Sequence, residues 1–264
     1  MASFACKDLQ VLNSDGIITL TLNRPQVCNA FNADLISELT EFSRWMREAP
    51  QRDVRAVFMR GAGKLFCSGG DLNWMKDSLA WNTQENYVDS EKLSAMFTAL
   101  NELEKPLIGL VHGGAYGGGV GLVSVCDHVI CEEKTVFSLS EVKLGLIPAC
   151  IGPFVLDKVG MSQARSLFIS GERFSAAKAK DIGLIHEVVA CADDLDVRQA
   201  AMVKTFLTCG PHAIQTAKRF LREIKFSGFP EANRLAAKTL ADLRVGPEAQ
   251  EGIRAFLEKR SPRW

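Results

Sequence analysis

Hydrophobic residues in the first part of the chain follow two different periods. Residues 5–25 alternate between apolar and polar side chains around a turn at residues 13–16, which predicts a hairpin of two short strands. Residues 33–49 place apolar side chains at steps of three and four after Asn32, a residue that favours helix N-caps, and this predicts an amphipathic helix. Residues 54–61 form a nearly continuous apolar run that ends in glycine, which is typical of a strand covered on both faces.

The same succession continues further along the chain. We expect a helix over residues 90–103 and a covered strand over residues 107–113. A short helix from Gly119 and a strand over residues 128–133 follow. Strands that alternate with helices indicate parallel crossovers. After Pro153 the pattern becomes almost wholly helical, apart from a short strand over residues 184–189. We therefore expect an α/β fold in two parts, residues 1–190 and a helical region of residues 191–264.

Composition and charge restrict the possible partners. The chain has 264 residues, of which 47% are hydrophobic and 23% charged, as in ordinary globular proteins. Lys plus Arg and Asp plus Glu each number 31, so no net charge draws the chain to nucleic acid or to an anionic membrane. No apolar run reaches the roughly 20 residues of a membrane-spanning helix, and the first ten residues lack the patterns of signal and transit peptides. We expect a cytoplasmic protein that binds neither nucleic acid nor membranes.

Cysteine and histidine, two common metal ligands, are scattered along the chain. The eight cysteines include no CxxC pair, and the four histidines show no HExxH or similar spacing. We therefore expect reduced thiols in a reducing compartment and no metal site.

Two glycine-rich segments stand at corresponding places, each after a covered strand and before an expected helix. They read LFCSGGDL at residues 65–72 and AYGGGVGL at residues 115–122. Neither has a Gly-Lys-Ser/Thr ending or a GxGxxG pattern, so a loop that cradles nucleotide phosphates is not indicated. Each segment is either a tight structural turn or a source of free backbone amides.

Free amides from two such loops would suit one kind of chemistry. Two converging N–H groups stabilise a negative oxygen as it forms, and a helix N-terminus adds its dipole. A thioester activated in this way can become an enolate, and a carboxylate nearby can then move protons on the neighbouring carbons. Glu141 is the candidate carboxylate, with a surface or salt-bridged glutamate as the alternative interpretation.

Several of these segments together resemble the crotonase, or enoyl-CoA hydratase/isomerase, superfamily. The segments FCSGGDL, HGGAYGGGVGLVSVCDH and FSLSEVKLGLIP occur in the order and spacing of that family, and the resemblance extends from about Asp15 to the C-terminus. It implies a crotonase-like α/β spiral of ββα units, with a helical C-terminal region that joins subunits into a homotrimer or a hexamer. It also implies a hydratase-type lyase that acts on an acyl-CoA thioester and has no tightly bound cofactor, coenzyme A being part of the substrate.

The resemblance assigns roles to individual residues. Ser68 and Gly118 fall where the family donates two backbone N–H groups to the thioester oxygen, and Glu141 falls at the second of its two catalytic carboxylates. Contacts with the substrate and coenzyme A are implied for Arg24, Cys67, Ser68, Gly69, Gly70, Asp71, Leu72, Gly118, Gly121 and Lys259. Arg24 could instead be a solvated charge at a strand end, Lys259 a surface lysine, and Asp71 the N-cap of the next helix.

The sequence departs from the family at the first catalytic carboxylate, where it has Gly121. One interpretation is an isomerase, since moving a double bond needs only one base that takes a proton and returns it. The other is a hydratase for an anionic, branched substrate, which a second carboxylate would crowd and repel, whereas Gly121 would leave room for the branch methyl. A third possibility is a crotonase-shaped binding or scaffold protein that has lost activity.

We favour the second interpretation. GGVGLV, SEVKLGLIPA and QEGIRAFLEKRSPRW look most like bacterial methylglutaconyl-CoA hydratases of leucine breakdown. The predicted reaction interconverts 3-methylglutaconyl-CoA and 3-hydroxy-3-methylglutaryl-CoA. Candidates to bind the distal carboxylate of this substrate are Lys76, Tyr87 and Lys92.

Overall fold

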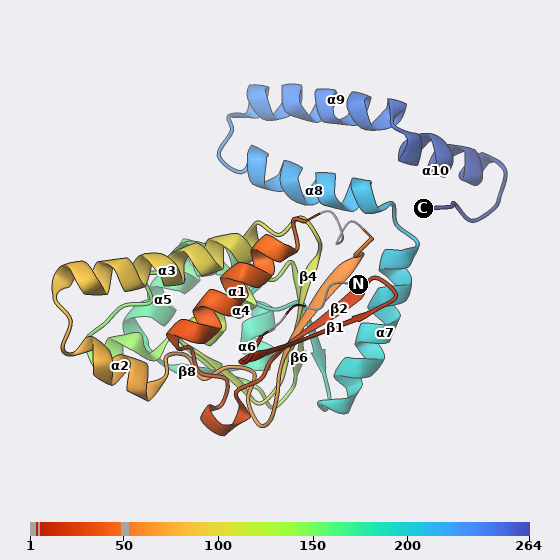
Figure 1. The fold of residues 1–264 in the computed structure, drawn as a ribbon. Coiled ribbons are helices and arrows are strands. Elements are labelled where there is room, and N and C mark those ends of the chain that lie inside the picture. Colours follow the sequence, from red (N-terminus) through yellow and green to blue (C-terminus); the bar gives the residue numbers. More distant parts are fainter. Residues whose placement is uncertain (1–3, 5, 49–52) are drawn as a thin grey trace.

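The computed structural model describes residues 4, 6–48 and 53–264. In Figure 1 these residues form a body of sheets and helices, from which an arm of three helices, α8 to α10, projects. The body contains two sheets.

The larger sheet has six strands in the order β1-β2-β3-β4-β6-β9. β1 (Leu9–Ser14) and β2 (Ile17–Leu22) pair antiparallel and confirm the predicted hairpin. The other strands, which pair in parallel, are β3 (Ala56–Gly61), β4 (Leu107–Val111), β6 (His128–Glu132) and β9 (Glu187–Val189). The parallel crossovers expected from the sequence are therefore present.

The smaller sheet is built from short strands that follow the long ones. Its members are β5 (Gly114–Tyr116), β7 (Val136–Ser138) and β8 (Arg173–Ser175). β4 leads into β5 and then α4 (Gly118–Val125). β6 leads into β7, the 3-10 helix η3 (Ser140–Leu144) and then α5 (Gly152–Ser170). Two strands and a helix thus recur as ββα units.

Helices cover the two faces of the larger sheet unequally. On one face lies the main hydrophobic core, to which α4, α5, α1 (Ala33–Trp45) and α3 (Thr83–Asn101) contribute. On the other face α7 (Asp193–Leu207) packs with Leu195, Met202 and Phe206. The remaining short helices of the body are η1 (Pro25–Val27), α2 (Leu72–Ser78) and α6 (Ala176–Asp181).

Two helix boundaries differ from the prediction. α1 has the predicted N-cap, because the Asn32 side chain accepts a hydrogen bond from the Leu35 amide, but it ends at Trp45. The predicted last residue, Ala49, lies outside the described residues. α3 begins at Thr83 rather than near residue 90, since Asn82 and Glu85 form a capping box there.

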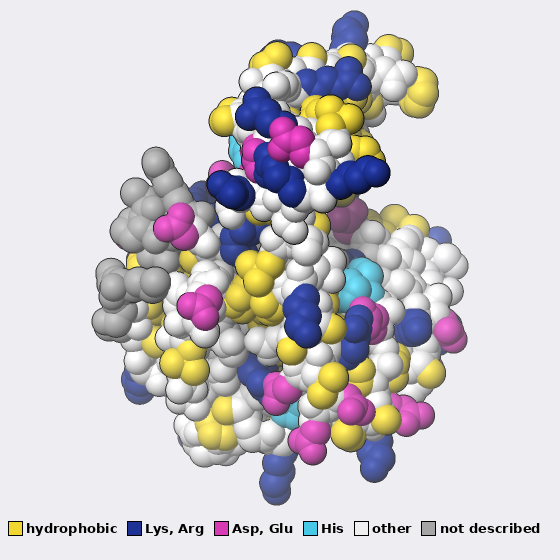
Figure 2. Space-filling view, turned by 90° about the vertical axis from the view of Figure 1, so that its right-hand side faces the viewer, with side chains coloured by type: hydrophobic (Ala, Val, Ile, Leu, Met, Phe, Trp, Pro, Cys, Tyr) yellow, Lys and Arg dark blue, Asp and Glu magenta, His cyan; other side chains and the backbone are white. Residues whose placement is uncertain are grey.

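The arm consists of α8 (Pro211–Ile224), α9 (Phe229–Val245) and α10 (Pro247–Leu257). Figure 2 shows lysine and arginine side chains over this arm and hydrophobic side chains where the arm meets the body. Among the residues that the structure describes, no helix has the length and apolar character needed to cross a bilayer.

Candidate active site

The two glycine-rich segments lie side by side. The Cys67 amide donates a hydrogen bond to the Gly114 carbonyl at 3.2 Å, and the Tyr116 amide donates one to the Cys67 carbonyl at 3.0 Å. At Gly119 an added Cβ would lie 2.5 Å from the Cys67 carbonyl oxygen, so only glycine permits this approach. The segments 65–72 and 115–122 are therefore hydrogen-bonded neighbours in close backbone contact.

Glu141 lies against the turn that starts α4. Gly117 makes this turn with a φ of +50°, and a Cβ added there would lie 3.0 Å from Oε1 of Glu141. Within the described residues, Oε2 of Glu141 is buried and has no hydrogen-bond partner. Burial raises the pKa of this carboxyl group above its ordinary value. A carboxylate that is short of partners and has a raised pKa is well suited to accept and return a proton.

The Gly118 amide stands next to this carboxyl group. Gly118 is the first residue of α4, so its N–H has no acceptor inside the helix, and the N-cap residue Gly117 has no side chain to satisfy the end. The positive end of the helix dipole lies at the same place. This end of α4 can therefore hold a negatively charged oxygen.

The structure gives a correction for the second predicted amide, that of Ser68. The Ser68 N–H donates to the Cys28 carbonyl at 3.0 Å, and its hydroxyl donates to the Val27 carbonyl at 3.3 Å. An amide already bonded to a carbonyl is not available to a thioester oxygen. The prediction of Ser68 as a donor therefore conflicts with its position in the fold.

The Gly70 amide is available instead. Phe31 and Gly70 form a parallel bridge, in which the Phe31 amide bonds to the Gly69 carbonyl and the Phe31 carbonyl accepts from the Asp71 amide. In such a bridge the N–H of Gly70 itself points away from Phe31. A Cβ added to Gly69 would lie 2.8 Å from the Tyr116 carbonyl oxygen, so this loop runs beside the start of α4. Gly70, which sequence reasoning assigned only to coenzyme A contacts, is the better candidate donor.

Gly121 does not leave room for a substrate. A Cβ added there would lie 2.3 Å from Cγ2 of Ile151 and 2.8 Å from Cε1 of Phe97. Both of these side chains are buried, with 3% and 0% of their surface exposed. The space that a carboxylate would occupy in α4 is thus filled by hydrophobic side chains, and the expectation of room for a branch methyl at Gly121 was wrong.

Arg24 is enclosed in the fold and pairs with two carboxylates. Its Nη2 donates to Oδ2 of Asp71 at 2.9 Å, its Nε lies 3.2 Å from Oδ2 of Asp8, and its Nη1 donates to the Ala30 carbonyl. The side chain is only 11% exposed. Neither the predicted phosphate contact nor the alternative of a solvated charge agrees with this arrangement.

Asp71 has the capping role that the sequence suggested. Its Oδ1 accepts a hydrogen bond from the Asn73 amide at 2.9 Å and so caps α2. Burial alone would raise the pKa of this carboxyl group, but the hydrogen bonds from Asn73 and Arg24 outweigh burial and lower it. Asp71 therefore stays ionised as part of the scaffold.

The other predicted coenzyme A residues divide into buried and exposed groups. Cys67 is buried, its Sγ lies 3.2 Å from the Asn29 carbonyl oxygen, and burial raises its pKa to about 12, so the thiol belongs to the core. Leu72, the first residue of α2, is 81% exposed. Lys259 is an exposed residue just after α10, and Figure 1 places that helix far from α2 and α3.

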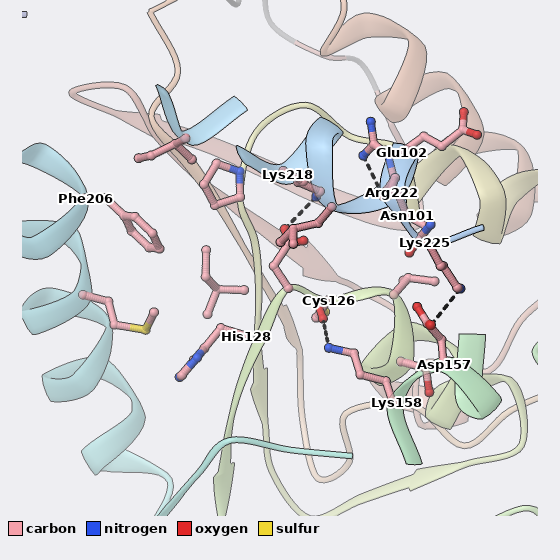
Figure 3. A pocket seen from close by; sticks show the side chains of 18 of the residues that line it. Asn101, Glu102, Cys126, His128, Asp157, Lys158, Phe206, Lys218, Arg222 and Lys225 are labelled. Carbon is pink, nitrogen blue, oxygen red and sulfur yellow. Dashed lines mark hydrogen bonds and ion pairs between the residues drawn. The ribbon is translucent and has the colours of Figure 1, made fainter. Parts of the chain in front are cut away.

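A separate pocket of about 770 Å³ lies at the other end of α4, between the arm and the body. Figure 3 shows its lysines, and Nζ of Lys158 donates to the Cys126 carbonyl at 2.7 Å. Nζ of Lys218 donates to Oδ2 of Asp127 at 2.6 Å. In the part of the chain that the structure describes, none of the predicted site residues lines this pocket. The ion pairs of Lys218 with Asp127 and of Lys225 with Asp157 join the arm to the body, whereas Lys158 bonds within the body.

The chain is similar to known proteins over nearly its whole length. The sequence matches the enoyl-CoA hydratase/isomerase family over residues 13–264. It is 29% identical to the peroxisomal Delta(3,5)-Delta(2,4)-dienoyl-CoA isomerase of Arabidopsis thaliana, over 100% of this chain and 98% of that protein.

Two solved structures extend the comparison to the fold. An enoyl-CoA hydratase from Shewanella pealeana superimposes with a TM-score of 0.92 at 33% identity, over 98% of this chain and 96% of that one. AtuE of Pseudomonas aeruginosa gives a TM-score of 0.93 at 32% identity, over 97% of this chain and 98% of that one. The predicted α/β fold with C-terminal helices is confirmed, and its strands form two sheets.

Proposed function

Because the chain belongs to the enoyl-CoA hydratase/isomerase family, we propose that it interconverts 3-methylglutaconyl-CoA and 3-hydroxy-3-methylglutaryl-CoA with Glu141 as its single acid and base. The observation that carries this proposal is the Glu141 carboxyl group, which has an unsatisfied buried oxygen and lies against Gly117, the residue before the first amide of α4. The choice of acyl group rests on the likeness of GGVGLV, SEVKLGLIPA and QEGIRAFLEKRSPRW to methylglutaconyl-CoA hydratases.

In the proposed reaction the thioester oxygen lies between the amides of Gly70 and Gly118. These donors, together with the dipole of α4, stabilise the negative charge of the enolate as it develops. Glu141 takes a proton from the water that attacks the β-carbon, and it then returns this proton to the α-carbon. In reverse, Glu141 removes the α-proton and assists the departing hydroxyl. A tertiary hydroxyl leaves more readily than a secondary one, which fits catalysis by one carboxylate.

A second candidate is an isomerase that moves the double bond of an enoyl-CoA. Phe97 and Ile151 fill the position opposite Gly121, so a single carboxylate would work against an apolar wall rather than beside a second acid. A lone base can take a proton from one carbon and return it to another without activating water. The relative from Arabidopsis thaliana bears the name of an isomerase of this kind.

One assay separates these possibilities. The protein is incubated with 3-methylglutaconyl-CoA, with crotonyl-CoA and with a 3-enoyl-CoA, while the absorbance of the conjugated thioester and the mass of the product are followed. Hydration removes the absorbance and adds one water to the mass, and we expect this for 3-methylglutaconyl-CoA. Isomerisation changes the absorbance at constant mass and would put the second candidate first. Binding with neither change would overturn both and leave a binding protein.

We also propose that the arm forms the contacts of a homotrimer or hexamer. Phe226, Phe229 and Phe256 of this region are 87%, 79% and 83% exposed, and no buried residue occurs in α9 among the described residues. Lys259, which lies beyond α10, would then reach the ligand of a neighbouring subunit rather than its own. Light scattering after gel filtration tests the assembly, and a monomer at the concentration of the assay would contradict it.

A further inference from the structure

Trp74 lies beside one of the two proposed oxyanion donors. A Cβ added to Gly70 would lie 3.6 Å from Cζ3 of Trp74 and 3.3 Å from Cε of Met75, so both side chains of α2 cover this part of the loop. Trp74 is partly buried and packs against the main hydrophobic core. The indole therefore lies directly beside Gly70.

The indole is tied to α3 by a hydrogen bond. Nε1 of Trp74 donates to Oδ1 of Asp89 at 3.3 Å. A partly buried indole N–H normally finds an acceptor, and here that acceptor is a carboxylate from a different helix. Asp89 thereby fixes the direction in which the ring faces.

Asp89 stands on the side of α3 that faces the site. Asp89, Leu93 and Phe97 follow at intervals of four residues, so they share one face of the helix. Phe97 on this face lies next to Gly121, and Leu93 packs against the core. One face of α3 thus continues from the apolar wall opposite Gly121 to the carboxylate that holds Trp74.

The loop after η3 meets α3 at the same level. Sγ of Cys150 lies 3.6 Å from the Ser90 carbonyl oxygen. Burial and, after it, the charge of Asp89 raise the pKa of the Cys150 thiol above its ordinary value. Cys150 precedes Ile151, the other side chain opposite Gly121. Asp89 therefore lies between Trp74 on one side and the segment of Cys150, which leads to the side chains that pack on Gly121, on the other.

From these contacts we infer that Trp74 determines specificity by packing its indole on the planar, conjugated acyl group, and that Asp89 is the positioning residue that orients the indole. This inference rests on the proposed function, because it assumes that the thioester lies at Gly70 and Gly118. A conjugated enoyl thioester is flat, so it presents a face to an aromatic ring. A saturated acyl chain, and the hydrated product with its tetrahedral β-carbon, fit a flat ring less well.

The test compares two ligands of equal length and charge. Crotonyl-CoA is unsaturated and planar, whereas butyryl-CoA is saturated. Both are titrated into Glu141→Gln protein, so that crotonyl-CoA is bound without turnover. We expect Trp74→Leu to reduce the preference for crotonyl-CoA over butyryl-CoA by about threefold to tenfold, the range of one aromatic contact, while the affinity for free coenzyme A stays within about twofold.

Asp89 is tested with two substitutions that differ in one property. Asp89→Asn keeps an oxygen that can accept from the indole, whereas Asp89→Leu removes it. We expect the asparagine variant to retain most of the preference and the leucine variant to lose about as much as Trp74→Phe, which lacks the indole N–H. If both Asp89 variants lose the preference equally, the hydrogen bond is not what positions the ring, and the inference for Asp89 fails.

Fluorescence supplies a readout that does not depend on catalysis. Binding of crotonyl-CoA should change the tryptophan emission of the Glu141→Gln protein, and Trp74→Phe should abolish that change. Trp81→Phe is the matched control, because Trp81 lies beyond α2 and should leave the change in place. An emission change that survives Trp74→Phe would overturn the role of Trp74. Failure of the wild-type protein to turn over any substrate, with these binding results intact, would instead count against the proposed function.

Discussion

The two ends of α4 differ in how far their polar groups are satisfied by hydrogen bonds from the rest of the fold. At the first residue, Gly118, the helix has an amide with no acceptor inside the helix and an N-cap without a side chain, and the nearby Glu141 carboxyl group has one oxygen without a partner among the described residues. At the other end the Cys126 carbonyl accepts from Lys158, and Oδ2 of Asp127 accepts from Lys218 (Figure 3). A helix that is satisfied by the fold at one end and left open at the other indicates where a ligand belongs.

The difference also has an electrostatic meaning. The amides at Gly118 form the positive end of the helix dipole, which favours a developing negative charge. At the negative end the fold supplies its own cations, and burial lowers the pKa of the amino groups of both Lys158 and Lys218. Side chains from α5 and α8 thus donate hydrogen bonds at the far end of α4, whereas the end that we assign to catalysis has no side-chain cap among the described residues.

The largest effect is expected at the open end. Glu141→Gln should lower the rate of hydration and dehydration by about 10²-fold or more, since an amide of similar shape cannot act as a base. Binding of the acyl-CoA should remain near normal. Steady-state rates and a binding titration measure the two quantities, with the exposed Glu172→Gln as the control. A variant that keeps more than about a tenth of the rate would rule out Glu141 as the base.

The pH dependence of the rate follows from the same group. Because burial raises the pKa of Glu141, the active carboxylate form should be lost at a higher pH than for an ordinary glutamate. The rate of hydration should therefore fall as the pH is lowered through this raised pKa. An acid limb at or below the ordinary pKa of glutamate, about 4.3, would contradict the burial argument.

The next effect concerns the amide of Gly118. Gly118→Pro removes one hydrogen from the first helical position, where proline is tolerated, and should cost about 10² to 10³ in rate. Gly118→Ala is the matched control, because it adds the same Cβ near Cε2 of Phe31, at 2.8 Å before relaxation, but keeps the amide. The ratio of the two rates, in protein shown to be folded by circular dichroism, isolates the hydrogen. Equal rates would remove Gly118 from the oxyanion site.

A smaller effect of another kind is expected at the closed end. Lys218→Met removes the partner of Asp127, which also accepts from the Leu107 amide, and should lower the free energy of unfolding by about 1–2 kcal/mol. The rate per folded molecule should change by no more than about fivefold, as a dipole interaction of about 1 kcal/mol permits. Lys238→Met, at an exposed pair with Asp242, is the control. A loss of rate as large as that of Glu141→Gln would mean that the two ends of α4 are not separate in function.

Sequence patterns pointed to the open end of α4 and not to the closed one, for a physical reason. Glycine-rich segments after covered strands and a glutamate in a familiar pattern are local signals, and they led to Gly118 and Glu141. The errors at Arg24 and Gly121 involve partners far along the chain, Asp71 in one case and Ile151 in the other. No local pattern marks such contacts.

Ser68 and Lys218 illustrate the same limit. The Ser68 amide is used by the Cys28 carbonyl, which approaches only because the chain returns after some forty residues. The Lys218 side chain meets Asp127 across the joint between the arm and the body. Element types and the order of the elements could thus be predicted, whereas the choice between Ser68 and Gly70 as the proposed donor required the packed fold.

The smallest effect compares the two carboxyl groups directly. A group whose pKa is raised in the folded protein destabilises that protein in its charged form, and the cost is fully present above the folded pKa. Glu141→Gln should therefore raise the melting temperature at pH 7, by about 2 °C for a chain of this size. This gain should shrink as the pH falls and vanish below the pKa of an unfolded glutamate, about 4.3, because Glu141 is then neutral in both the folded and the unfolded protein.

Asp127→Asn should have the opposite sign at neutral pH, because it breaks the ion pair with Lys218 and leaves a largely buried ammonium group without its partner. Melting curves of the wild type and both variants between pH 4 and pH 8 provide the measurement. A lower melting temperature for Glu141→Gln at pH 7 would mean that its carboxylate has a stabilising partner in the folded protein, and the contrast between an open and a closed end of α4 would not hold. Opposite signs would show that the fold stabilises one end of this helix and accepts a cost at the other, where the proposed chemistry needs a free base.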